Sequence, residues 1–174
     1  MNVVFLDIDG VIQSYDSNID INNNANNIKE LLTQKFGVDY SKYDPYELYD
    51  VYYNWSKVAI KRLKEILQET NARIIVSSDW RDENKPNKIK DYLKVYNLDN
   101  YWFEDNFIEK NYGLDPIKKR YMEINQSINE YPISNYVILD DMNGLQKYFP
   151  NNFVKTYDYL SKDDVKKAIR ILKK

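Results

Sequence analysis

Short apolar runs alternate with amphipathic segments along this 174-residue chain. The apolar runs are too short for helices and carry β-branched or aromatic residues, so each predicts a buried strand. Four runs are clear, and a fifth at Tyr101–Phe103 is weaker; the four are Val3–Leu6, Arg73–Val76, Tyr136–Leu139 and Phe153–Thr156. Continuously apolar strands are typical of a parallel sheet that is covered on both faces.

The segments between these runs have helical spacing. Ser56 can cap a helix that extends to Glu69, and Asp115-Pro116 is a typical helix start, with Asp as N-cap and Pro in the first turn. A weaker helix is expected over 87–96, and Ser161 can cap a final helix. This alternation predicts an α/β fold, a Rossmann-like three-layer αβα sandwich with a mostly parallel sheet, as a single domain over 1–174.

The segment 14–55 breaks this pattern. It is rich in Asn, Tyr and Asp, contains one plausible helix near 27–36, and is too long for an ordinary connection. We interpret it as a small insertion after the first strand that covers the active-site edge. Its aromatic residues are expected to form a small satellite core rather than a substrate surface; they are Tyr43, Tyr46, Tyr49, Tyr52, Tyr53 and Trp55.

The composition excludes several kinds of chemistry. The chain has no cysteine and no histidine, so disulfides, thiolate zinc sites and Ser-His-Asp catalysis are ruled out. Acid–base chemistry would then need carboxylates, Lys or Tyr, and a metal would be a hard cation held by oxygen, Mg²⁺ first.

The charge and hydropathy also indicate the setting. A net charge of −2 argues against a protein that coats nucleic acid or an anionic membrane. There is no apolar run of membrane-spanning length and no recognisable signal peptide. We therefore expect a cytoplasmic protein with no membrane and no obligate protein partner.

Acidic residues follow two of the predicted strands. Asp7 and Asp9 come directly after the first strand, where Gly10 permits a sharp turn, and Asp140-Asp141 end the strand at Leu139. In a parallel sheet, sites form beyond the carboxyl ends of the strands. Carboxylates gathered there repel one another, so the pattern predicts an Mg²⁺ site with Asp7, Asp9, Asp140 and Asp141 as ligands.

Two further polar segments suit a phosphoryl group. Ser77 and Ser78 follow the strand that ends at Val76, where a hydroxyl and free backbone N–H groups can hold a phosphoryl oxygen, and Arg81 lies just beyond.

A fixed positive side chain is also needed, and 118–120 offers three. Helical geometry places Arg120 nearest the apolar face, Lys118 in between, and Lys119 pointing away. Arg120 is therefore favoured, with Lys118 second.

Taken together, these residues resemble the four motifs of the haloacid dehalogenase (HAD) superfamily, in the superfamily's order. The motifs are Asp7 to Val11, then Ser77 or Ser78, then Arg120 or Lys118, then Asp140-Asp141. The run Ser77 to Arg81, a helix start at Arg120 to Ile124 with one residue added, and the strand end Leu139 to Asp141 are similar to the HAD domain of Swiss army knife RNA repair proteins.

The resemblance implies a covalent mechanism. Asp7 would attack phosphorus and form an aspartyl-phosphate, while Asp9 would act as general acid and then general base. Mg²⁺ would bridge Asp7, the Asp9 carbonyl, and Asp140 or Asp141.

The remaining motif residues would hold the substrate. Ser77 and Arg120 would bind the remaining phosphoryl oxygens, with further substrate contacts at Gly10, Ser78, Arg81 and Lys118.

The function predicted is that of an Mg²⁺-dependent phosphomonoester hydrolase acting on a phosphorylated small molecule. The alternative is a nucleic-acid end phosphatase in RNA or DNA repair, which would need a local basic groove of Lys85, Lys88, Lys90 and Arg81. A receiver-like phospho-acceptor domain is disfavoured because the Asp-x-Asp pair opens the chain. An inactive HAD-fold binding module is disfavoured because all four motifs are present.

Overall fold

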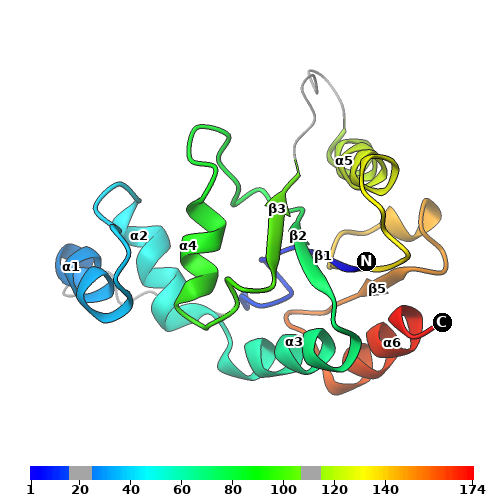
Figure 1. The fold of residues 1–174 in the computed structure, drawn as a ribbon, viewed down its shortest axis with the longest axis horizontal. Helices are drawn as coiled ribbons and strands as arrows, with labels where there is room; N and C mark the ends of the chain where they lie inside the picture. Colours follow the sequence, from blue (N-terminus) through cyan, green and yellow to red (C-terminus); the bar gives the residue numbers. More distant parts are fainter. Residues whose placement is uncertain (16–24, 107–114) are drawn as a thin grey trace.

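The computed structural model describes residues 1–15, 25–106 and 115–174. Its strands form a single parallel sheet in the order β3-β2-β1-β4-β5 (Figure 1). The strands are β1 (Asn2–Leu6), β2 (Arg73–Val76), β3 (Trp102–Asp105), β4 (Asn135–Asp140) and β5 (Phe153–Lys155). The predicted α/β sandwich with a parallel sheet is therefore confirmed, and the weakest predicted strand, β3, is displaced by a residue or two.

Helices cover both faces of the sheet. The helices are α1 (Ala25–Phe36), α2 (Pro45–Tyr49), α3 (Lys57–Thr70), α4 (Lys88–Lys94), α5 (Pro116–Glu130) and α6 (Lys162–Leu172), with a π-helical turn η1 (Asp50–Asn54) and a 3₁₀ turn η2 (Leu145–Lys147). In β1, Val4 and Leu6 pack in the core with α3, α4 and α6, whereas Val3 and Phe5 face α5. Alternate side chains of a strand point to opposite faces, which is why both must be apolar here.

The helices begin where the sequence predicts. Ser56, Asp115 and Ser161 each accept a hydrogen bond from a backbone N–H in the first turn, at 3.2, 3.0 and 3.2 Å. Ser161 and Asp164 complete a capping box at the start of α6. Each cap satisfies N–H groups that have no partner inside the helix, so these starts depend on local chemistry alone.

The insertion packs beside α4, where α1 and α2 lie at the end of the molecule remote from β5 (Figure 1). Tyr43 and Trp55 are buried in the same core as Leu63 of α3, so the expected satellite core is wrong: these aromatics extend the main core. Tyr46 and Tyr53 are exposed. The part of the insertion at 16–24 lies outside the described residues.

The chain order creates a topological switch point between β1 and β4. The chain builds β1, β2 and β3 toward one edge, then returns to add β4 and β5 on the other side of β1. Hydrogen bonds continue past the strands, because Asp7 N–H donates to the Leu139 carbonyl at 3.0 Å and Ser77 N–H to the Leu6 carbonyl at 2.9 Å. The three polar strand ends therefore meet at one edge, at the crevice where open α/β sheets bind their ligands.

Within the described ranges, no helix has the length and apolar character needed to cross a bilayer.

Candidate active site

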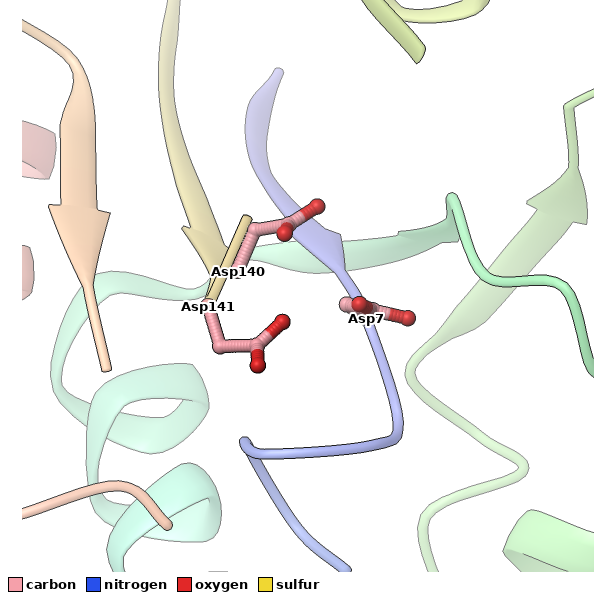
Figure 2. A group of neighbouring side chains, drawn as sticks. All are labelled: Asp7, Asp140 and Asp141. Carbon is pink, nitrogen blue, oxygen red and sulfur yellow. The ribbon is translucent and has the colours of Figure 1, made fainter. Parts of the chain in front are cut away.

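Three carboxylates meet at the switch point. Asp7 follows β1, Asp140 ends β4 and Asp141 comes next, and one oxygen of each lies within 4.8 Å of the others (Figure 2). Asp140 is fully buried and Asp7 nearly so. Oxygen donors at this spacing can hold a divalent cation.

Gly10 makes this approach possible. Its φ of +67° is a left-handed conformation, and its N–H donates to the Gln13 carbonyl at 2.8 Å, so the chain turns sharply after Asp9 as predicted. A Cβ atom on Gly10 would lie 2.8 Å from the Cβ of Asp141. Glycine is needed here because Asp141 occupies the space of a side chain.

Arg120 is the cation of the site. Its Nη1 lies 2.5 Å from Asp140 Oδ2 and 3.5 Å from Asp7 Oδ2, and its side chain is buried. Burial acts to lower the pKa of Arg120, but Asp7 and Asp140 outweigh it and the net effect is a raised pKa. The guanidinium therefore stays charged between two acidic strand ends.

The single positive charge of Arg120 does not balance the negative charges of Asp7, Asp140 and Asp141. Burial raises the pKa of Asp7, although Arg120 and a hydrogen bond from Ser78 hold back part of the rise. Burial and the charge of Asp7 together raise the pKa of Asp140 to about 7. The donor set therefore fits a divalent cation, which would favour the ionised form of each carboxylate.

The two serines occupy different positions. The Ser78 hydroxyl is hydrogen-bonded to Asp7 and also accepts from the Trp80 backbone N–H at 3.4 Å. The Ser77 hydroxyl is buried and has no hydrogen-bond partner among the described residues. Ser78 thus positions Asp7, while Ser77 keeps an unpaired donor at the strand end.

Arg81, predicted to contact the substrate, lines the pocket beside the site and is held there by protein acceptors. Its guanidinium donates to Glu123 Oε2 at 3.0 Å, to Asn106 Oδ1 at 2.8 Å, and to the Ser78 carbonyl. These protein acceptors hold the buried guanidinium, so Arg81 fixes the turn that carries Ser78. The sequence pattern missed Glu123, because a lone glutamate on a helix gives no sign of being buried.

Trp80 is a site residue that the sequence did not reveal. Its indole N–H donates to Asp9 Oδ2 at 3.0 Å, and its ring packs edge-on against Trp55 at a centroid distance of 5.9 Å. Burial raises the pKa of Asp9, and the Trp80 hydrogen bond lowers it in part. The carboxylate of Asp9 lies outside the group formed by Asp7, Asp140 and Asp141. The atom by which Asp9 is predicted to bind Mg²⁺ therefore remains its backbone carbonyl oxygen.

Tyr15 is a second residue that the sequence did not reveal. It lies where the insertion begins, and its hydroxyl donates to Asp141 Oδ2 at 2.5 Å. Its backbone N–H donates to Asp158 Oδ1 at 3.0 Å, which ties it to the segment after β5. A tyrosine in a tyrosine-rich segment carries no sequence signal that would mark this contact.

Lys118 was predicted to lie nearer the site than Lys119, and this prediction is wrong. Lys118 is exposed, and its backbone N–H serves the Asp115 cap. Lys119, expected to point away, has its Nζ 3.9 Å from Asp79 Oδ1 and 3.9 Å from Glu123 Oε1. A long lysine side chain can reach round the helix toward acidic groups on either side, which a helical wheel does not represent.

The four basic side chains named for a nucleic-acid groove each lie beside an acidic or aromatic group. Lys88 is buried, with its Nζ 2.8 Å from a Glu47 carboxylate oxygen, Lys85 Nζ lies 3.7 Å from Asp82, and Lys90 lies over the Trp102 ring. Arg81 is paired with Glu123.

The doubly wound sheet, the Asp-x-Asp turn after its central strand and the acidic pair across the switch point are features of the HAD class. The model of one family, described as the HAD domain in Swiss Army Knife RNA repair proteins, matches residues 3–165. The chain therefore belongs to this family. No curated protein and no solved structure matches the chain significantly.

Proposed function

We propose that this chain is an Mg²⁺-dependent phosphomonoester hydrolase that acts through an aspartyl-phosphate on Asp7. The observation that carries the proposal is a nearly buried carboxylate, Asp7, at the switch point, with a fixed guanidinium and two further carboxylates close to it. A metal ion would complete the positive half of a site for a phosphoryl dianion.

Asp7 is held in one orientation. Its Oδ1 accepts the Ile8 N–H at 2.8 Å, and Ser78 and Arg120 also hold the carboxylate. In the proposed reaction, an oxygen of Asp7 forms a bond to phosphorus as the bond to the alcohol oxygen breaks. Fixing the nucleophile in advance removes part of the entropy cost of the attack.

Asp9 would move the protons. Its proton would pass to the departing alcohol oxygen, and the resulting carboxylate would then deprotonate the water that attacks phosphorus and releases Asp7 and inorganic phosphate. The raised pKa of half-buried Asp9 suits a group that must carry a proton in the first step. The Trp80 hydrogen bond to Oδ2 leaves Oδ1 as the oxygen that exchanges the proton.

The other groups would bind charge. Asp7, Asp140 and Asp141 would hold Mg²⁺, which would offset the repulsion between the carboxylates and the phosphoryl oxygens. Arg120 and the unpaired Ser77 hydroxyl would bind phosphoryl oxygens.

The test is phosphate release from para-nitrophenyl phosphate with and without Mg²⁺. Asp7→Asn should lower kcat by at least ~1000-fold, since loss of a covalent nucleophile has effects of this size. Asp163→Asn, an exposed change on α6, is the matched control and should keep full activity. Turnover that survives Asp7→Asn would contradict the mechanism, and a folded native chain with no turnover would favour an inactive binding module.

A second candidate is a nucleic-acid end phosphatase, favoured by the family's description. It would use the same catalytic groups on a 3′- or 5′-phosphorylated end. Comparing phosphorylated oligonucleotides with generic monophosphates separates the two candidates.

A further inference from the structure

A polar pocket of about 450 Å³ adjoins the site. Ser78 and Asp79 both line this pocket. Ser78 is hydrogen-bonded to Asp7, and Asp79 Oδ1 lies 4.0 Å from Arg120 Nη2. The volume is in the range of small-molecule pockets. The alcohol part of a phosphate ester whose phosphoryl group is bound at Asp7 would therefore lie next to this pocket.

Carboxylate and amide side chains also line this pocket. Glu47 reaches it from α2 of the insertion, and Asp82, Glu83 and Asn84 come from the loop between β2 and α4. Glu83 is exposed, whereas Asp82 accepts the Asn84 backbone N–H at 3.0 Å and lies 3.7 Å from Lys85 Nζ. The Glu83 carboxylate is therefore available to a ligand.

The cations of this pocket are already paired. Lys88 lies 2.8 Å from Glu47, Arg81 lies 3.0 Å from Glu123, and Lys119 lies 3.9 Å from Asp79. The pocket lining thus holds four carboxylates and three cations, each cation within 4 Å of a carboxylate, so a second phosphate entering it would meet no excess of positive charge. Hydroxyl groups, by contrast, would find charged acceptors, which form stronger hydrogen bonds than neutral ones.

We infer that the pocket binds the alcohol part of the substrate, an inference that rests on the proposed function. This part is a small, hydroxyl-rich group without further phosphates. The substrate class is then a sugar or polyol monophosphate. An oligonucleotide end is disfavoured, because its neighbouring phosphates would face Asp82 and Glu83.

The test compares kcat/KM for four esters: glucose 6-phosphate, hexyl phosphate, fructose 1,6-bisphosphate and a 3′-phosphorylated oligonucleotide. Hexyl phosphate has a similar alkyl leaving group but lacks the hydroxyls. We expect glucose 6-phosphate to exceed each of the others at least ~10-fold, since sites that bind a hydroxyl reject analogues that lack it. Equal values for glucose 6-phosphate and hexyl phosphate, or a preference for the oligonucleotide, would overturn the inference.

Charge changes at the pocket give a second measurement. Glu83→Gln should lower the ratio of glucose 6-phosphate to hexyl phosphate turnover, and Glu83→Lys should raise the ratio of oligonucleotide to glucose 6-phosphate turnover ~10-fold. Glu65→Gln, an exposed change on α3, is the control and should leave both ratios unchanged. Unchanged ratios in both Glu83 variants would also overturn the inference.

An assay with para-nitrophenyl phosphate distinguishes failure of the proposed function from failure of this inference about the substrate. If the native chain does not hydrolyse it with Mg²⁺, the proposed function fails and this inference fails with it. If the chain hydrolyses it but prefers the oligonucleotide, only the inference fails and the end-phosphatase candidate replaces it.

Discussion

Replacing Gly10 with alanine tests whether the close approach of Asp141 creates the metal site. The backbone at Gly10 has a φ of +67°, and the new Cβ would lie 2.8 Å from the Cβ, Cγ and Oδ2 atoms of Asp141. Oδ2 is also the atom that accepts the Tyr15 hydroxyl. The carboxylate must therefore move, and its contacts must move with it.

The chain offers a matched control. Gly37 has a φ of +68°, but a Cβ there would meet nothing within 4 Å. Alanine in a left-handed conformation costs about 1–2 kcal/mol at either position. The overlap at Gly10 should add about 1–3 kcal/mol, the usual cost of overpacking. We therefore expect Gly37→Ala to lower the free energy of unfolding by about 1–2 kcal/mol and Gly10→Ala by about 2–5 kcal/mol.

Urea unfolding at a series of Mg²⁺ concentrations measures both quantities. A cation that binds only the folded chain raises the free energy of unfolding by RT ln(1 + [L]/Kd), so the series yields a Kd without any turnover. Displacing Asp141 should raise this Kd by ~10-fold or more in Gly10→Ala and leave it unchanged in Gly37→Ala. If Gly10→Ala responds to Mg²⁺ at the same concentrations as the native chain, the role assigned to Asp141 is refuted.

Three further changes test other contacts. Trp80→Phe removes the donor that lowers the pKa of Asp9, so this pKa should rise further and the pH profile of kcat/KM should move to higher pH; an unmoved profile would mean that Asp9 does not control it. Asp105→Asn should stabilise the fold at pH 8 by on the order of 1–2 kcal/mol, and not at pH 4, in urea unfolding at both pH values. The reason is that burial raises the pKa of Asp105 to about 6, so between about pH 4 and pH 6 the unfolded chain releases a proton that the folded chain keeps. Stability falls across this range and stays lower above pH 6, by at most about 3 kcal/mol and by less because Asp105 is partly exposed. Glu123→Gln should lower the free energy of unfolding by about 3 kcal/mol, because it leaves the buried guanidinium of Arg81 without its counter-charge; a loss below ~1 kcal/mol in the same assay would show that the pair contributes little.

Sequence patterns alone were enough to predict the strands, the helix starts and the meeting of the acidic strand ends. Runs such as Val3–Leu6 and caps such as Ser56 depend on residues a few positions apart, so their signals are local. Parallel strands place their carboxyl ends at one edge, and this rule alone brings Asp7 and Asp140 together.

The partner of each polar or aromatic group depends instead on how the helices and strands pack together. Arg81 pairs with Glu123 across 42 positions, and Trp80 donates to Asp9 across 71. Trp55 of the insertion joins the core of the main sheet. These contacts depend on distances between elements that are remote in the chain, and no local periodicity contains that information. The ion pair of Lys88 with Glu47, which joins α4 to the insertion, is a further example.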